Sequence, residues 1–215
     1  MARMTLTEIG RKHKTDKVDV HHTFCGVNYL DVYEKYFAPL RDLDSSIFEI
    51  GIKKGASLRV WEEYFTIGRV VGLDINANCA SMKFNRARIV IGDQTDPKAL
   101  QQVYAANGYG LFDVILDDGS HINRLTLHSF ELLWAHVKPG GYYILEDMKC
   151  TYLGDNLISE QKRGGWHYKY ERDNESNDRS EIDRTLLRLV CEMDHLRGDV
   201  RTIHIHPMTY VIEKV

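Results

Sequence analysis

One apolar run that ends abruptly in acidic residues constrains this chain more than any other feature. Residues 111–116 read Leu-Phe-Asp-Val-Ile-Leu, and Asp117-Asp118-Gly-Ser-His121 follow at once. An apolar, β-branched run of this length is typical of a buried central strand. Ligands of open α/β sheets bind at the carboxyl ends of the strands. We therefore expect two carboxylates and an imidazole at a binding edge.

A second run repeats this ending. Residues 140–145 read Gly-Gly-Tyr-Tyr-Ile-Leu and predict another strand, which is followed by Glu146 and Asp147. If the two strands are neighbours, up to four carboxylates and one imidazole converge on one point. Like charges that lie this close require a cation or shared protons.

These side chains suit a metal-assisted proton transfer. Asp118, Glu146 and Asp147 are candidate ligands of one hard divalent ion, Mg²⁺ foremost, by all-oxygen ligation. The ion would lower the pKa of a substrate hydroxyl, and His121 would take its proton as general base. Asp117 is a further catalytic candidate, and its role is open. It is either a metal ligand in place of Asp118 or a contact to a cofactor. In the competing interpretation the acids cap helices or pair with nearby cations, namely Lys53, Arg124 and Lys149.

The hydrophobic pattern along the chain predicts alternating strands and helices. We expect strands over residues 46–51, 69–75, 87–92, 112–116 and 142–145. We expect helices over residues 5–11, 29–40, 58–65, 78–85, 96–106, 123–136 and 181–196, and a turn over 138–141. Residues 200–206 and 209–215 alternate polar and apolar side chains about a turn, which is a hairpin pattern. The predicted fold is an α/β, Rossmann-like, doubly wound seven-stranded sheet, mostly parallel with a C-terminal antiparallel hairpin, in one domain over residues 1–215.

Two segments stand apart from this pattern. Residues 1–28 are polar, and their length and composition alone favour a solvated tail over an arm that folds across a site. Residues 148–178 form a long segment with few aliphatic side chains, which suggests a functional loop or lid. Trp166, Tyr168 and Tyr170 within it are candidates for stacking on a sugar, or for packing the loop onto the domain.

The ends of the first three strands predict a nucleoside pocket. The turn from Gly51 to Gly55, with Ser57 behind it, lets a ligand approach the backbone closely. Asp74 ends the second strand, where an acid can accept both hydroxyls of a ribose. Asp93, followed by Gln94, ends the third strand, where an adenine edge is expected. Each residue alone is better explained as a loop residue or helix cap, but together they favour the pocket.

Composition excludes several classes of protein. The net charge of −3 gives no electrostatic case for nucleic acid or for an anionic membrane. The four cysteines are scattered without the CxxC spacing of zinc sites. The N-terminus has no apolar signal core, and no apolar run approaches membrane-spanning length. We expect a cytoplasmic protein with reduced cysteines.

Residues 46–147 resemble class I S-adenosylmethionine-dependent methyltransferases. The motifs that carry this resemblance are Glu49-Ile-Gly51 with Gly55, Gly72-Leu-Asp74, Gly92-Asp93, 113–117 and the Lys-Pro-Gly-Gly at 138–141. More narrowly, residues 9–17, 117–121 and 146–147 resemble the Mg²⁺-dependent O-methyltransferases that modify sugars of macrolides and polysaccharides. This narrower resemblance is specific, because three separated motifs agree.

The resemblance implies S-adenosylmethionine and Mg²⁺ as cofactors. It implies the metal on Asp118, Glu146 and Asp147 and the base at His121. It also implies that the arm covers the methionine end of the cofactor, contrary to the solvated-tail interpretation. The arm residues concerned are Thr15, Asp16, Lys17, His22 and Tyr29.

The resemblance leaves the acceptor open. The macrolide enzymes carry an additional N-terminal domain, so we expect a stand-alone catalytic domain closer to polysaccharide enzymes, such as those that act on methylated mannosides. A macrolide or other natural-product sugar is the alternative acceptor. We expect a small-molecule sugar or glycan partner and a homodimer. From other classes of protein, a nicotinamide-dependent oxidoreductase or a non-catalytic cofactor-binding module are the alternatives.

Overall fold

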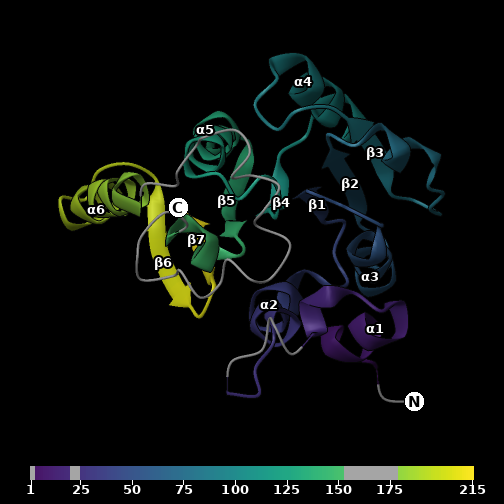
Figure 1. Ribbon diagram of the computed structural model, residues 1–215. Helices are drawn as coiled ribbons and strands as arrows, with labels where there is room; N and C mark the ends of the chain where they lie inside the picture. The colour runs from purple at the N-terminus through teal and green to yellow at the C-terminus, as the bar shows by residue number, and fades with distance from the viewer. Residues whose placement is uncertain (1–2, 20–24, 153–178) are drawn as a thin grey trace.

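A seven-stranded sheet forms the centre of the protein in the computed structural model, which describes residues 3–19, 25–152 and 179–215 (Figure 1). The strand order is β3-β2-β1-β4-β5-β7-β6. The strands are β1 (Ser46–Ile50), β2 (Arg69–Asp74), β3 (Arg88–Ile91), β4 (Phe112–Asp117), β5 (Val137–Leu145), β6 (Val200–His206) and β7 (Thr209–Lys214). The first five pair in parallel, and β7 pairs antiparallel with both β5 and β6. The predicted fold class is therefore confirmed.

Helices cover both faces of the sheet (Figure 1). The α-helices are α1 (Leu6–His13), α2 (Tyr29–Phe37), α3 (Ala56–Tyr64), α4 (Pro97–Ala106), α5 (Asn123–Leu133) and α6 (Arg179–Asp194). The 3₁₀ turns are η1 (Asp16–Val18), η3 (Ala38–Leu40), η4 (Ala77–Ser81), η5 (Trp134–His136) and η6 (Met148–Tyr152). One core lies between the sheet and α4, α5 and α6, and a second lies between the sheet and α1, α2 and α3. This is the layered arrangement expected of alternating strands and helices.

The arm is part of this second core, so the solvated-tail interpretation was wrong. Leu6 and Ile9 of α1 are fully buried, because helix α1 places both on the face that meets the core. Thr5 caps the helix through a capping box with Glu8, which fixes where α1 begins. The arm therefore gains apolar burial that its overall polar composition does not reveal.

Two local predictions also differ from the structure. The helix expected over residues 78–85 is only the 3₁₀ turn η4, which ends at Ser81. Phe84 and Met82 instead pack over Gly55. The turn expected at residues 138–141 belongs to β5, where the register against β4 shifts and Gly140 has φ +74°. A β-bulge absorbs the Pro-Gly-Gly sequence within the strand.

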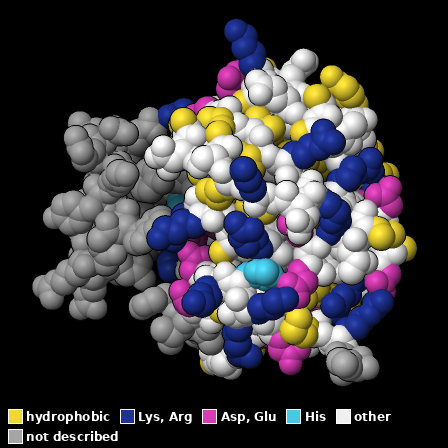
Figure 2. Space-filling model, turned by 90° about the vertical axis from the view of Figure 1, so that its right-hand side faces the viewer, with side chains coloured by type: hydrophobic (Ala, Val, Ile, Leu, Met, Phe, Trp, Pro, Cys, Tyr) yellow, Lys and Arg dark blue, Asp and Glu magenta, His cyan; other side chains and the backbone are white. Residues whose placement is uncertain are grey.

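The surface mixes charges. Over the face that carries α1, α3 and α4, Lys and Arg side chains are interspersed with acidic and apolar ones (Figure 2). Among the described residues, no helix combines the length and the apolar character needed to cross a lipid bilayer.

Candidate active site

The carboxyl ends of β1, β4 and β5 lie side by side and carry the acidic residues. Ile50, Asp117 and Leu145 are in register across the three strands. The backbone amide of Asp118 donates to the carbonyl of Ile50, and the amide of Glu146 donates to the carbonyl of Asp117. The hydrogen-bonded sheet therefore brings the two acidic turns together, as the sequence predicts.

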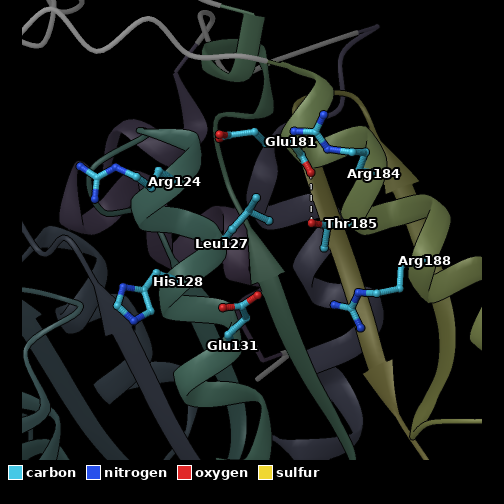
Figure 3. A pocket seen from close by; sticks show the side chains of 8 residues that line it. All are labelled: Arg124, Leu127, His128, Glu131, Glu181, Arg184, Thr185 and Arg188. Atoms are coloured by element: carbon cyan, nitrogen blue, oxygen red, sulfur yellow. Dashed lines mark hydrogen bonds between the residues drawn. The ribbon is translucent and has the colours of Figure 1, made fainter.

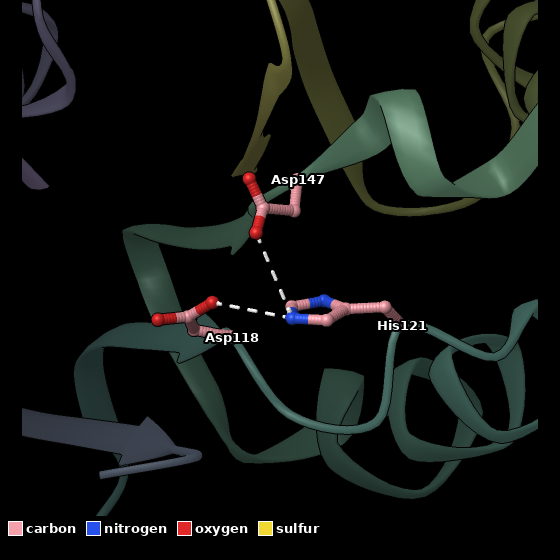
Figure 4. A group of neighbouring side chains, drawn as sticks. All are labelled: Asp118, His121 and Asp147. Carbon is pink, nitrogen blue, oxygen red and sulfur yellow. Dashed lines mark ion pairs between the residues drawn. The ribbon is translucent and has the colours of Figure 1, made fainter. Parts of the chain in front are cut away.

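Three side chains face a common point at this edge: Asp118, His121 and Asp147 (Figure 4). Their potential ligand atoms all lie within 4.8 Å of one another. The Nε2 atom of His121 is 3.8 Å from Oδ1 of Asp118 and 3.7 Å from Oδ2 of Asp147. Asp118 and His121 come from the turn after β4 and Asp147 from the turn after β5, so the cluster depends on the pairing of these strands.

The backbone at two of these residues is left-handed. His121 has φ +55° and Asp147 has φ +53°. Such values are uncommon for residues other than glycine, although Asp and His adopt them more readily than most. Left-handed residues concentrate at functional sites, where the surrounding structure holds them in place. The two turns thus aim both side chains back over the strand ends.

A buried lysine from the arm reaches the same acids. The Nζ atom of Lys17 lies 2.6 Å from Oδ2 of Asp118, 2.8 Å from Oε2 of Glu146 and 3.4 Å from Oε1 of Glu49. The side chains of Lys17 and Glu146 are 3% and 1% exposed. Glu146 therefore faces the ammonium of Lys17 and lies outside the cluster of Asp118, His121 and Asp147. Asp118 belongs to both groups.

Burial and charge perturb the titration of this group. Burial raises the pKa of Glu146, and the neighbouring Asp118 raises it further against the opposing effect of Lys17. Burial likewise raises the pKa of Glu49. Burial alone would lower the pKa of Lys17, but the three carboxylates outweigh it and the net shift is upward. One ammonium against three carboxylates leaves surplus negative charge in a buried place.

Tyr29 supports the cluster from α2. Its hydroxyl donates a hydrogen bond of 2.7 Å to Oδ1 of Asp147 and accepts one from the amide of the same residue. Burial, followed by the charges of Asp147 and Glu146, raises the pKa of Tyr29. The tyrosine therefore remains a neutral donor that fixes the orientation of the Asp147 carboxylate.

Asp117 points elsewhere. Its buried carboxylate accepts hydrogen bonds from the amide of Gly119 at 3.2 Å, from the hydroxyl of Tyr143 at 3.2 Å and from the amide of Gln94 at 3.5 Å. Burial raises the pKa of Asp117 to about 7, against these hydrogen bonds. Of the two adjacent acids, Asp118 is the one that faces His121 and Asp147. The geometry thus favours Asp118 over Asp117 as a ligand.

The turn after β1 lies directly against this site. Gly51 has φ +83°, and a Cβ there would lie 2.0 Å from the carbonyl oxygen of Asp118. Gly55, at φ +72°, is the N-cap of α3. Ser57 and Trp61 of α3 both donate to Oε2 of Glu49, at 2.7 and 2.9 Å. Oε1 of Glu49 has no hydrogen-bond partner among the described residues.

The remaining predicted cofactor residues line the strand ends on the other side of β1. Asp74 accepts hydrogen bonds from the amides of Ile52 and Lys53 in the Gly51–Gly55 turn, at 3.0 and 2.9 Å. Asp93 accepts from the amide and hydroxyl of Thr95. Gln94 accepts from the amide of Ser120 and donates to Ser129, so it ties the end of β3 to the turn after β4.

The structure brings most of the predicted arm residues to the same edge. Thr15 is buried and caps η1, and Asp16 pairs with Lys53 at 2.8 Å. Lys17 and Tyr29 contact the acids as described above. His22 lies outside the described residues, as do Trp166, Tyr168 and Tyr170, so their predicted roles stay predictions. At the start of the expected lid, Met148 and Cys150 of η6 are buried.

Sequence reasoning missed several contacts. It assigned Lys17 to the cofactor and not to the acids, and it did not single out Trp61 beside Glu49 or Tyr143 beside Asp117. No spacing or motif signals these contacts, because each joins side chains from different helices, strands or turns. The sequence also suggested Lys53 and Lys149 as ion-pair partners of the acids. In the structure Lys149 lies 4.0 Å from Asp147, whereas Lys53 pairs with Asp16 of the arm.

A groove of about 570 Å³ lies away from this cluster, between α5 and α6 (Figure 3). Arg124, His128 and Glu131 line it from α5. Glu181, Arg184 and Arg188 line it from α6. None of the predicted site residues that the structure describes lies in this lining.

The acidic edge fits a hard divalent ion. Asp118 and Asp147 offer carboxylate oxygens, which are the ligands that Mg²⁺ prefers, and Glu146 lies adjacent. Three carboxyl groups surround the single ammonium of Lys17, and Oε1 of Glu49 has this ion pair but no hydrogen bond among the described residues, which indicates a place that can receive further positive charge. The neighbouring Gly51 turn and Asp74 suit a nucleoside cofactor.

Comparisons with known proteins find relatives of this chain. No protein-family model matches the chain. The 8-demethyl-8-alpha-L-rhamnosyl tetracenomycin-C 2'-O-methyltransferase of Streptomyces olivaceus is 35% identical over 154 residues, or 68% of this chain and 38% of that protein. Demethylmacrocin O-methyltransferase of Streptomyces fradiae is 36% identical over 158 residues, or 70% of this chain and 38% of that protein.

A solved structure extends the match to nearly the whole chain. MycE, a methyltransferase from the mycinamycin biosynthetic pathway in complex with Mg and SAH, has a TM-score of 0.73 and 27% identity. The match covers 99% of this chain and 55% of that one. The chain thus spans about two fifths of the length of the curated relatives and about half of this solved structure.

The seven-stranded sheet with its antiparallel end, and the acidic cluster at its carboxyl edge, define a class I methyltransferase fold. Within this class, the chain is a homologue of the sugar O-methyltransferases of macrolide and tetracenomycin pathways. The resemblance recognised in the sequence is confirmed.

Proposed function

We propose that this protein is an S-adenosylmethionine-dependent, Mg²⁺-assisted O-methyltransferase that acts on a sugar hydroxyl of a glycoside. The convergence of Asp118, His121 and Asp147 on one point beside the Gly51 turn carries this proposal. The relatives support it: they are named as O-methyltransferases of glycosylated natural products, and MycE is titled as a complex with Mg and SAH. These relations do not favour the nicotinamide-dependent alternative.

The cofactor pocket follows from the strand ends. In this proposal Asp74 accepts the ribose hydroxyls, and Asp93 and Gln94 contact the adenine end. Glu49, Gly51, Gly55 and Ser57 form the wall beside the methionine end. In this proposal the arm covers the methionine end of the cofactor through Thr15, Asp16, Lys17, His22 and Tyr29. Asp117 lies behind the cofactor pocket.

The reaction needs one proton acceptor and one anchored hydroxyl. When bound, S-adenosylmethionine supplies a methyl group on a sulfonium, and the divalent ion lowers the pKa of the acceptor hydroxyl. Asp118 and Asp147 would hold the ion, with the adjacent Glu146 as the third predicted ligand. His121 accepts the hydroxyl proton at Nε2 as the oxygen–carbon bond forms and the carbon–sulfur bond breaks. Tyr29 keeps Asp147 oriented, and the fixed strand ends hold the reacting atoms in line.

The proposal also names the class of acceptor. The acceptor that we propose is a sugar hydroxyl of a glycoside, an oligosaccharide or a polysaccharide precursor, including a methylated mannoside. We propose a role as a lid over the acceptor for residues 148–178, and stacking on its sugar rings for Trp166, Tyr168 and Tyr170, three residues that lie outside the described part of the chain. A macrolide or other natural-product sugar is the competing acceptor, since the relatives' names include such compounds. We also propose a cytoplasmic homodimer, which light scattering and cell fractionation test.

A methyl-transfer screen tests the activity. Labelled S-adenosylmethionine is incubated with a panel of mannosides, other oligosaccharides and macrolide glycosides, with Mg²⁺ or with EDTA. Transfer to at least one sugar that requires Mg²⁺ is the expected result. A thermal shift with NAD and none with S-adenosylhomocysteine would contradict the proposal. Transfer that is unaffected by EDTA would remove the metal from it.

A further inference from the structure

Lys17 reaches the acidic edge from a distant part of the chain. It lies in η1, 101 residues before Asp118 and 129 before Glu146. Its side chain is 3% exposed, and its Nζ atom donates at 2.6 Å to Asp118 and at 2.8 and 2.9 Å to the two oxygens of Glu146. A lysine buried to this extent is uncommon unless it is paired. The pairing here is with the acids of the candidate metal site.

The two oxygens of Asp118 have different neighbours. Oδ2 accepts from Lys17, whereas Oδ1 faces His121 and, across it, Asp147. One carboxylate is thus shared between the ammonium and the point that suits a divalent ion. An ammonium is a compact positive charge, so it repels a second cation at this distance. The ammonium of Lys17 and a divalent ion must therefore compete for the negative charge of the Asp118 carboxylate.

Lys17 also accounts for how the acids coexist without an ion. Asp118, Glu146 and Glu49 converge from the ends of β4, β5 and β1, and Lys17 is within 3.4 Å of all three. Without a cation among them, buried carboxylates repel one another or take up protons. The lysine therefore neutralises part of the charge that would otherwise drive these strand ends apart.

We propose that Lys17 is an internal counter-ion of the metal site, which holds Asp118 and Glu146 together before metal binds and weakens the affinity for the divalent ion. This inference rests on the proposed function, because it takes the acidic edge as the metal site. Its consequence is a link between the arm and the metal: ion binding draws Asp118 from Lys17 and loosens one of the contacts that hold the arm. Lys17 acts as a positioning residue, through Asp118 and Glu146.

Metal binding by three variants tests this role. Lys17→Met keeps the length of the side chain and removes the charge, whereas Lys17→Arg keeps the charge. Lys12→Met is the matched control, because Lys12 lies on the same arm but pairs with Glu63 at the surface. Each protein is titrated with Mn²⁺ by calorimetry, without S-adenosylmethionine or acceptor. We expect Lys17→Met to lower the Mn²⁺ dissociation constant at least about tenfold, because unit charges a few ångströms apart interact strongly in a partly buried site. Lys12→Met and Lys17→Arg should stay close to the wild type.

Unchanged or weaker Mn²⁺ binding in Lys17→Met would overturn the inference, because it would show that the ammonium of Lys17 does not weaken the affinity of the site for the ion. If Lys17→Met does not fold alone, thermal unfolding is followed against Mn²⁺ concentration. A variant that Mn²⁺ restores, with a larger rise in Tm than the wild type shows, supports the inference. A variant that saturating Mn²⁺ does not restore overturns it. The wild-type titration reports separately on the proposed function: if the wild type does not bind Mn²⁺, the metal-assisted reaction fails whatever Lys17→Met does.

Discussion

The ammonium of Lys17 lies 2.6 Å from Oδ2 of Asp118, although 101 residues separate the two in the chain. This ion pair joins the N-terminal arm to the turn after β4. Because the other oxygen of Asp118 faces His121, the pair also connects the arm to the residue proposed as general base. The arm therefore contributes a side chain to the candidate active site.

Asp118→Asn should abolish turnover and leave cofactor binding intact. Asparagine keeps the shape of the side chain but removes the negative charge that the cluster with His121 and Asp147 shares. Methyl transfer and calorimetry with S-adenosylhomocysteine measure the two properties separately. Asp42→Asn is the control, since Asp42 forms an exposed ion pair with Arg3. Loss of cofactor binding together with turnover would instead assign Asp118 to folding or to the cofactor.

His121→Ala should lower turnover by about 10² to 10⁴, which is the usual contribution of a general base. The imidazole lies between two carboxylates at the strand ends, where an acceptor hydroxyl bound to the ion would be within its reach. Single-turnover kinetics with saturating acceptor measure the chemical step. His128→Ala on the exposed side of α5 is the matched control. A wild-type rate in His121→Ala would remove histidine from the mechanism.

Asp117→Asn should reduce the dependence of stability on pH. Burial raises the pKa of Asp117 from 3.8 to about 7, so the folded protein retains a proton that the unfolded chain has already lost in this range. The stability from this group is complete below about pH 4 and is lost as the pH rises to about 7. Each pKa unit corresponds to roughly 1.4 kcal/mol.

Urea unfolding of both proteins at pH 5 and pH 8 checks this prediction. The variant should gain stability relative to the wild type as the pH rises, since it has no carboxylate to ionise at this position. Burial also raises the pKa values of Glu49 and Glu146, so both proteins should still lose some stability. A constant difference between the two proteins across this pH range would show that Asp117 does not titrate there.

Gly51→Ala should destabilise the protein more than Gly140→Ala. Both glycines have positive φ, +83° and +74°, and alanine pays about 1–2 kcal/mol in this region. At Gly51 the new Cβ would also lie 2.0 Å from the backbone carbonyl of Asp118, whereas at Gly140 it meets nothing within 4 Å. Backbone atoms of a sheet edge do not move aside as a side chain can. Equal losses in the free energy of unfolding would show that the contact at Gly51 relaxes at no cost.

Local sequence patterns predicted the strands well because each strand is a short apolar run with clear ends. Asp96 and Pro97 also marked the start of α4 correctly, as a cap and a first-turn residue. The predictions were wrong where long-range packing decides the backbone. Residues 138–141 lie inside β5 because β4 pairs with Val137 before them and with Tyr142 after them, and Leu6 and Ile9 are buried because a complete core is available to α1.

The sequence by itself determined that acids, a glycine turn and a histidine would gather at the carboxyl edge of a parallel sheet. Only the tertiary structure decided that Asp118 faces His121 and Asp147 and that Asp117 faces Tyr143. Only the tertiary structure placed Lys17 between Asp118 and Glu146. The physical reason is that these contacts join segments up to 129 residues apart, and local periodicity carries no information on which distant side chains meet.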